Sequence, residues 1–259
     1  MRRAPLPIVG LAALGALLLV VPVAALLVRA PWGDLVETMT GVGAWTALRL
    51  SIVVSLAATA ISVVLGVPLA WVLARARFRG RTVVRALVVL PVVLPPVVGG
   101  VGLLAALGRS GLLGRVLYEQ VGVQLTFTTG GAIVAASFVS MPLVVLAVEA
   151  GLRSMDHEYE ATAAALGGRP GYVLRRVTLP LVAPHLAAGA VLTWARALGE
   201  FGATITFAGN LQGRTQTLPL AVFEARQTDP DGAILLSLVL VALSVAVLVA
   251  LRDRIAPRR

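Results

Sequence analysis

The sequence predicts an all-α polytopic membrane protein with six transmembrane helices and both termini in the cytoplasm. Hydrophobic residues make up 58% of the 259 residues and the mean hydropathy is +0.93, values typical of integral membrane proteins rather than soluble domains. Six mostly apolar runs are each long enough to cross a bilayer. Arginines gather in alternate segments between these runs, and this bias sets the orientation.

The six expected spans share a length of about 20 apolar residues. They are residues 8–28, 51–74, 86–107, 129–150, 185–206 and 231–251. The first span follows Met-Arg-Arg, but its apolar stretch is longer than that of a signal peptide, so we expect a retained helix. We expect residues 1–259 to form a single transmembrane domain.

The distribution of arginine predicts the N-in, C-in orientation. With both termini inside, 15 of the 22 basic residues fall in cytoplasmic segments and six fall outside, while Arg196 lies within a span. The cytoplasmic arginines lie before residue 8, in residues 75–85, in residues 151–184 and in the C-terminal tail. The net charge of +10 therefore indicates loops beside anionic lipid, and we expect no nucleic-acid partner.

Two missing residue types exclude several kinds of chemistry. All 22 basic residues are arginine, and the chain has no cysteine. The lack of lysine excludes a Walker-type ATP site, and the lack of cysteine excludes disulfides and thiolate metal sites. No carboxylate spacing around His157 or His185 is typical of a metal site. We therefore expect no catalytic residue and no bound metal ion on this chain.

The third expected span contains helix-breaking residues, in LPVVLPPVVGGVG at residues 90–102. Pro91, Pro95 and Pro96 each remove a backbone donor and crowd the preceding turn, so we expect this helix to be kinked or broken. One interpretation is a packing kink beside small residues that allow close helix approach. The other is irregular backbone that lines a pathway, with Pro95 and Pro96 at its wall.

The fifth expected span carries two charges one helical turn apart, Arg196 and Glu200, in TWARALGEFGATI at residues 193–205. Both lie near the middle of the span, where ionisable side chains are costly and tend to be functional. Residues at helical spacing extend the pair into a polar stripe that we expect to face the bundle interior or a water-filled cavity. The stripe consists of His185, Gly189, Thr193, Arg196, Glu200 and Thr204.

The largest cytoplasmic loop, residues 151–184, predicts a helix–turn–helix. A short helix is expected from Asp156 to Leu166, because acids enrich its start and alanines follow. Gly167 and Gly168 are candidates to end it, and Pro170 suits the first position of a second helix. An apolar stripe faces the cytosol in this prediction, formed by Tyr159, Ala163 and Leu166.

The second half of this loop resembles the Glu-Ala-Ala signature of ABC importer permeases. The resemblance is carried by the spacing of Gly167, Val177, Leu179 and Pro180. In that family the loop forms a coupling helix that docks in a groove of the ATPase subunit.

The match departs from the family pattern at its acidic position. This chain has Ala161 where the family has Glu, with Glu160 one residue early, while Ala163 keeps the second alanine of the signature. The departure leaves open whether Glu158 or Glu160 meets the ATPase.

Three further stretches are similar to the molybdate branch of the molybdate, sulfate and tungstate group of these permeases. They are residues 90–100, 127–143 and 196–225. The resemblance implies a type I ABC importer permease fold and a homodimer in the bacterial inner membrane. It also implies two ATPase subunits that carry ATP and magnesium, a periplasmic or lipid-anchored oxyanion-binding protein, and no cofactor on this chain.

The function implied by the resemblance is molybdate import by alternating access. A sulfate, thiosulfate or tungstate permease is the alternative within the group. An ion-coupled secondary transporter is the alternative from another class, and it should show an internal repeat and intramembrane carboxylates free to carry protons. The sequence shows no convincing repeat and one deeply placed acid, Glu200.

Arg196 and Glu200 have three interpretations in such a permease. A carboxylate repels an oxyanion, and tight binding to Arg196 would prevent release, so direct anion binding is disfavoured. Pairing that only fixes helix packing is the second interpretation. We favour the third, in which the pair lies at the wall of the translocation path, beside Thr193 and Thr204, and helps to set a gate.

Overall fold

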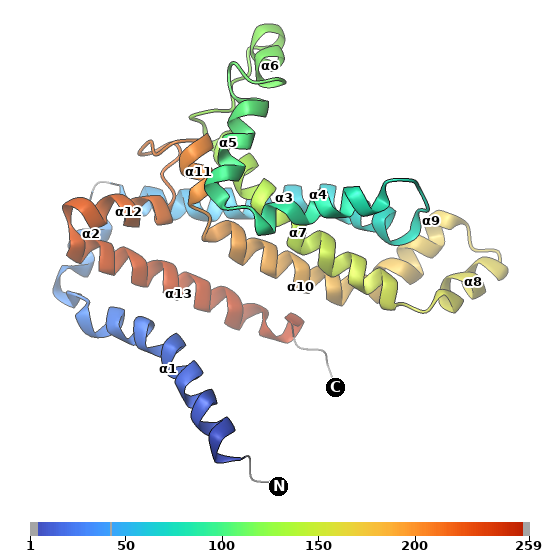
Figure 1. Cartoon of the computed structure of the whole chain (residues 1–259), viewed down its shortest axis with the longest axis horizontal. Helices are drawn as coiled ribbons and strands as arrows, with labels where there is room; N and C mark the ends of the chain where they lie inside the picture. Colours follow the sequence, from blue (N-terminus) through green and yellow to red (C-terminus); the bar gives the residue numbers. More distant parts are fainter. Residues whose placement is uncertain (1–4, 42, 256–259) are drawn as a thin grey trace.

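The computed structural model describes residues 5–41 and 43–255, and this part of the chain is helical with no strand. Figure 1 labels most of its helices along the chain. They are α1 (Leu6–Arg29), α2 (Leu35–Thr40), α3 (Ala44–Arg75), α4 (Arg81–Val93), α5 (Pro96–Leu107), α6 (Gly114–Val121), α7 (Thr129–Ser154), α8 (His157–Ala165), α9 (Pro170–Val173), α10 (Leu179–Leu198), α11 (Gly202–Phe207), α12 (Leu218–Thr228) and α13 (Pro230–Ile255). A 3₁₀ turn (Trp32–Asp34) precedes α2, and a π-helical turn η2 (Leu174–Thr178) joins α9 to α10. The all-α prediction is confirmed.

The core of the fold is formed by α3, α7 and α10, with α13 against α10 (Figure 1). Glycines let these helices approach closely. A Cβ added at Gly66 would lie 3.0 Å from Val144 Cγ1, and one added at Gly189 would lie 2.8 Å from Ala147 Cβ. Small residues at helix contacts are the usual basis of packing inside membranes, where lipid competes with apolar side chains.

The expected spans are partly confirmed. Within the described residues, five helical stretches are long and apolar enough to cross a membrane: Pro7–Arg29, Ala44–Arg75, Thr129–Ser154, Pro170–Leu198 and Pro230–Val247. The third expected span, residues 86–107, is not one continuous helix, because α4 and α5 are separate. The break agrees with the expectation of a kinked or broken third span, and the count of six transmembrane helices stays a prediction.

The fifth span is displaced from its expected bounds of 185–206. It begins at Pro170, because α9, η2 and α10 form one continuous helical stretch, and it ends at Leu198. The π-helical turn lies just before Pro180, whose missing N–H would otherwise interrupt the hydrogen-bond ladder.

Two of the segments expected to be cytoplasmic, residues 75–85 and 151–184, lie together at one end of the bundle. Arg75, at the C-terminal end of α3, contacts His157 of α8, and Figure 1 shows α8 and α9 at this end with α2 and α12 at the other. Arginines 2, 3, 258 and 259, which contribute to the predicted orientation, lie outside the described residues. The orientation across the membrane stays a prediction.

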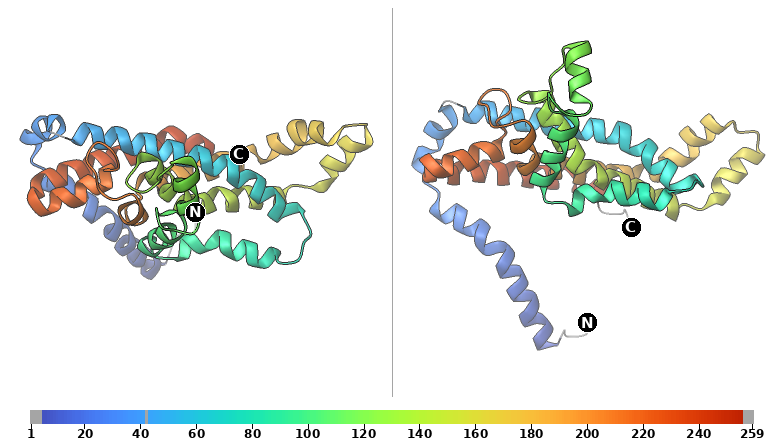
Figure 2. Two further views of the ribbon diagram at one scale, coloured as in Figure 1. Left: turned by 90° about the horizontal axis from the view of Figure 1, so that it is seen from above. Right: turned by 45° about the horizontal axis from the view of Figure 1, so that its top comes forward.

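Helix α1 stands away from the bundle in Figures 1 and 2. None of its spanning residues is buried. Only its C-terminal end packs on α13, where Leu26 and Ala30 meet Leu235 and Leu238. Its apolar surface is therefore free to face lipid or another protein.

Candidate functional site

The third expected span is broken between Val93 and Pro96, as the prolines predict. Leu94 and Pro95 adopt extended backbone, with ψ values of 139° and 130°. Pro96 occupies the first turn of α5, where a missing N–H costs nothing. The hydrogen-bond ladder does not run from α4 into α5, and α5 turns away from the bundle axis (Figures 1 and 2).

A second break lies in the fifth span, where a continuous helix through residue 206 was expected. Helix α10 ends at Leu198, and α11 begins at Gly202. The Glu200 carboxylate accepts a hydrogen bond of 2.8 Å from the Ala203 N–H through Oε1, which satisfies a free donor at the start of α11. The expectation was wrong because Glu200 caps a new helix instead of continuing the old one.

The two breaks meet in space, because α5 packs against α11. A Cβ added at Gly202 would lie 2.9 Å from Pro96 Cβ, and one added at Gly100 would lie 2.6 Å from Thr206 Cβ. The predicted path residues Pro95 and Pro96 therefore adjoin the break that contains Glu200. This junction of two interrupted helices is the candidate site.

Arg196 and Glu200 form an ion pair at this junction. Arg196 Nη1 lies 2.7 Å from Glu200 Oε2, and the side chains are 35% and 1% exposed, respectively. Both Glu200 oxygens are thus engaged, one by Arg196 and one by Ala203. An approaching anion would meet a neutral pair, and not a free guanidinium.

Most of the rest of the predicted polar stripe faces the interior of the chain, whereas His185 is exposed. Thr193 and Thr204 are buried, and Thr193 Oγ1 lies 3.4 Å from the carbonyl oxygen of Ser140 on α7. The His185 ring covers Gly151 of α7, where an added Cβ would lie 2.6 Å from the ring. Within this chain, the stripe packs mainly on α7, and the Arg196 side chain remains 35% exposed.

Sequence reasoning missed a second buried acid, Glu149 on α7. Its side chain is 6% exposed and pairs with Arg153 at 2.9 Å and with Arg85 of α4. Arg153 lies four residues later, which is a local signal, whereas Arg85 is distant in sequence. Residue 149 lies at the end of the expected span 129–150, so the expectation of one acid deep in the membrane stays a prediction. Two guanidinium groups engage the Glu149 carboxylate.

The helix–turn–helix predicted for residues 151–184 forms with the expected local chemistry. The Asp156 side chain accepts a 3.0 Å hydrogen bond from the Glu158 N–H at the start of α8. Gly167 has a φ of +87°, and Pro170 is the first residue of α9. These contacts confirm the helix from Asp156 to Leu166 and the turn after it.

The predicted coupling residues are divided between outward and inward positions. The apolar side chains of Tyr159 and Leu166 are exposed, while Ala163 is partly buried. The exposed members of the coupling set are Glu158, Ala161, Gly167, Leu179 and Pro180. Glu160 and Val177 are partly buried, and Glu160 turns toward the transmembrane helices.

Replacing Gly167 with alanine is expected to loosen the turn that follows α8. A side chain at a φ of +87° costs roughly 1–2 kcal/mol, so amide hydrogen exchange in α8 should accelerate by about five- to thirtyfold. Gly171→Ala is the matched control, because an added Cβ there meets no atom within 4 Å and the backbone is helical. Equal exchange in both variants would contradict this role of Gly167.

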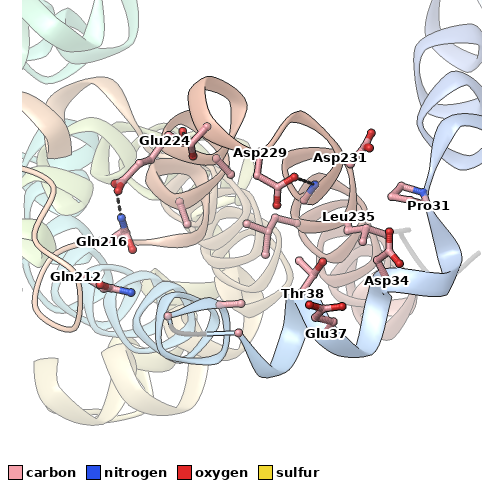
Figure 3. A pocket seen from close by; sticks show the side chains of 18 residues that line it. Pro31, Asp34, Glu37, Thr38, Gln212, Gln216, Glu224, Asp229, Asp231 and Leu235 are labelled. Carbon is pink, nitrogen blue, oxygen red and sulfur yellow. Dashed lines mark hydrogen bonds between the residues drawn. The ribbon is translucent and has the colours of Figure 1, made fainter.

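A pocket of about 500 Å³ lies at the opposite end of the bundle, between the segment around α2 and the start of α13 (Figure 3). Its carboxylates come from Asp34, Glu37, Glu224, Asp229 and Asp231. Glu224 accepts hydrogen bonds from Asn210 and Gln216, and Asp229 accepts one from the Gly232 N–H. The negative charge of the carboxylates that line this pocket disfavours the binding of an oxyanion there. No three metal-ligating side chains converge anywhere in the described residues.

Residues 62–259 match the family of binding-protein-dependent transport system inner membrane components. The chain belongs to this family. It is 46% identical over 240 residues to the molybdenum transport system permease protein ModB of Mycobacterium tuberculosis. The aligned region covers 93% of this chain and 90% of that protein. The corresponding protein of Escherichia coli K12 is 41% identical over 202 residues, with coverages of 77% and 88%.

A related permease and a solved structure complete the comparison. The sulfate transport system permease protein CysT of Salmonella typhimurium is 34% identical over 236 residues, covering 90% of this chain and 85% of that protein. A bacterial alginate ABC transporter, solved with an alginate pentasaccharide-bound periplasmic protein, has a TM-score of 0.77 at 15% identity, with coverages of 98% and 96%. This likeness confirms the importer-permease fold.

Proposed function

We propose that this chain is the permease subunit of an ATP-driven molybdate importer in the bacterial inner membrane. The observation that supports this most strongly is the 46% identity to a molybdenum transport permease over 93% of the chain. The sulfate permease is more distant at 34%, which favours molybdate over sulfate. Membership of a binding-protein-dependent family argues against the ion-coupled alternative.

ATP is hydrolysed on separate subunits that dock on α8. The chain has no lysine for a Walker-type site, so the ATPase supplies the nucleotide and magnesium. The exposed Tyr159 and Leu166 give α8 an apolar face suited to a groove on that partner. A periplasmic or lipid-anchored binding protein delivers the oxyanion at the opposite end.

Two copies of the chain enclose the path, and each binds one ATPase subunit. An uncovered α1 supports this arrangement, as does Arg196, a charge at membrane depth that remains 35% exposed in one chain. Native mass spectrometry of the intact complex is expected to give two permease and two ATPase chains. A single permease chain in the active complex would contradict the homodimer.

The junction of the two breaks is the gate of this importer. Pro95 and Pro96 have no N–H to donate back into α4, so α5 is free to pivot. Glu200 holds α11 to α10 through the ion pair with Arg196 and the bond from Ala203. Relative movement of α5 and α11 alternates access, while the neutral pair lets the oxyanion pass without trapping it.

The proposal is tested by measuring ATPase stimulation in liposomes that contain this chain and its ATPase. Binding protein loaded with molybdate should stimulate ATP hydrolysis, and the same assay with sulfate- and tungstate-loaded protein ranks the oxyanions. Stimulation by the sulfate-loaded protein but not by the molybdate-loaded one would overturn the assignment of molybdate as the substrate. Transport that is independent of any ATPase would overturn the assignment of the chain to an ATP-driven importer.

A further inference from the structure

Glu160 of α8 points back to the transmembrane helices, and both of its oxygens have partners there. Oε1 accepts a 2.6 Å hydrogen bond from the Thr178 hydroxyl, and Oε2 lies 3.0 Å from Arg75 Nη2. The Glu160 and Arg75 side chains are 25% and 14% exposed, and Thr178 is buried. This carboxylate is therefore already occupied within the chain.

The partners of Glu160 belong to two helices that enter the membrane. Arg75 is the last residue of α3, where a cation also suits the helix dipole. Thr178 is the last residue of the π-helical turn η2. Arg75 contacts α8 a second time through His157, whose Nε2 lies 3.0 Å from Arg75 Nη1. One carboxylate thus connects α8, α3 and the helix that leads to the gate.

The backbone connection from α8 to that helix is a short turn that contains two glycines. It passes through Gly167 and Gly168, which give the turn little resistance to rotation. The Gly168 N–H bonds the Ala163 carbonyl at 3.0 Å, which closes the turn but does not tie α8 to the membrane helices. Without the side-chain contacts of Glu160, a displacement of α8 would rotate this turn and would not move the helix that follows it.

Glu158, the other acid of the loop, is exposed, and its backbone N–H is bonded to Asp156. Successive residues on an α-helix are turned by about 100°, so moving an acid from position 161 to 160 turns it to another side of α8. In this structure Ala161 is exposed, and Glu160 faces Arg75.

We propose that Glu160 is a positioning residue that joins the coupling helix to α3 and to the helix of residues 170–198. When the ATPase displaces α8, the Arg75–Glu160–Thr178 connection carries the displacement to both helices together, and the second of these ends beside the Arg196–Glu200 pair. Glu158 is left to meet the ATPase. The inference rests on the proposed docking of the ATPase on α8.

The test compares Glu160→Gln with Glu158→Gln in the complete complex in lipid nanodiscs and proteoliposomes. Glu160→Gln should co-purify with the ATPase and keep basal hydrolysis within about twofold, while molybdate uptake per ATP falls by about tenfold. Thr178→Val and Arg75→Gln should show the same loss. Glu158→Gln, at the exposed acid that we assign to the ATPase contact, should instead weaken co-purification with the ATPase and leave amide exchange in α8 at the wild-type rate.

Two further measurements separate a connection within the chain from an ATPase contact. The exchanged pair Arg75→Glu with Glu160→Arg should recover uptake per ATP, because Thr178 can accept a hydrogen bond as well as donate one. Amide hydrogen exchange in α8 should be about tenfold faster in Glu160→Gln than in wild type, whether or not the complex transports.

Two results would overturn the inference. One is loss of ATPase co-purification in Glu160→Gln with no recovery in the exchanged pair. The other is wild-type exchange in α8 in Glu160→Gln. Failure of wild-type ATPase stimulation by every loaded binding protein would overturn the proposed function instead, and the exchange measurement would still decide the role of Glu160.

Discussion

Replacing Glu200 with alanine is expected to abolish molybdate uptake and to destabilise the chain by about 3 kcal/mol. Removing one partner of a buried ion pair costs about 3–5 kcal/mol, and we take the lower end because Arg196 is 35% exposed. The same change removes the acceptor for the Ala203 N–H at the start of α11. Uptake into proteoliposomes and the thermal unfolding midpoint in nanodiscs measure the two effects.

Two companion variants separate the charge of Glu200 from its capping role. Glu200→Gln keeps an oxygen that can accept from Ala203 but leaves Arg196 without its counter-charge. The double variant Arg196→Gln with Glu200→Gln removes both charges and should recover most of the stability. Reversal of the pair should fail, because arginine at position 200 cannot accept the Ala203 N–H. Wild-type uptake and stability in Glu200→Ala would refute this account of the junction.

Replacing Gly100 with valine is expected to force α5 and α11 apart. An added Cβ would lie 2.6 Å from Thr206 Cβ and 3.0 Å from the Ala203 carbonyl oxygen, and neither atom belongs to a flexible side chain. Overpacking of this kind typically costs about 1–3 kcal/mol, and the displacement acts directly on the two breaks. We expect uptake to be lost with the ATPase still bound, as co-purification and uptake assays would report.

Gly102→Val is the matched control for this prediction. A Cβ added at Gly102, on the same helix, meets no atom within 4 Å. It should therefore leave both uptake and the thermal midpoint close to wild type. Equal effects at positions 100 and 102 would show that valine perturbs α5 itself, and not its contact with α11.

The sequence predicts best where neighbouring residues decide the structure. Asp156 as a helix cap and Gly167 at a positive φ are local features, and α8 forms between them as expected. Pro95 and Pro96 likewise predict the break between α4 and α5, since proline cannot donate a hydrogen bond whatever surrounds it.

Features that depend on tertiary contacts were missed. Glu200 has the spacing of a helical ion pair with Arg196, and that spacing is preserved, but a bond to Ala203 and the close fit of Gly202 on Pro96 accompany the start of a new helix. The pairing of Glu149 with Arg85 joins α7 to α4 across a long sequence separation, which helical periodicity does not reveal.

The bounds of the fifth span were missed for a related reason. The loop expected at residues 151–184 contains Pro180 and Pro184, yet the helix runs through both, with the π-helical turn before them. That continuity connects Thr178, which donates a hydrogen bond to Glu160 of α8, to the Arg196–Glu200 pair at the other end of the helix. The sequence alone places the two ends of this helix in separate elements.

The most direct test of the central claim is uptake of labelled molybdate into proteoliposomes that contain this chain, its ATPase and molybdate-loaded binding protein. We predict accumulation that requires ATP on the ATPase side and is lost when the ATPase is replaced by a variant that cannot hydrolyse ATP. Accumulation of molybdate without ATP hydrolysis, or ATP-driven uptake of sulfate with none of molybdate, would contradict the account.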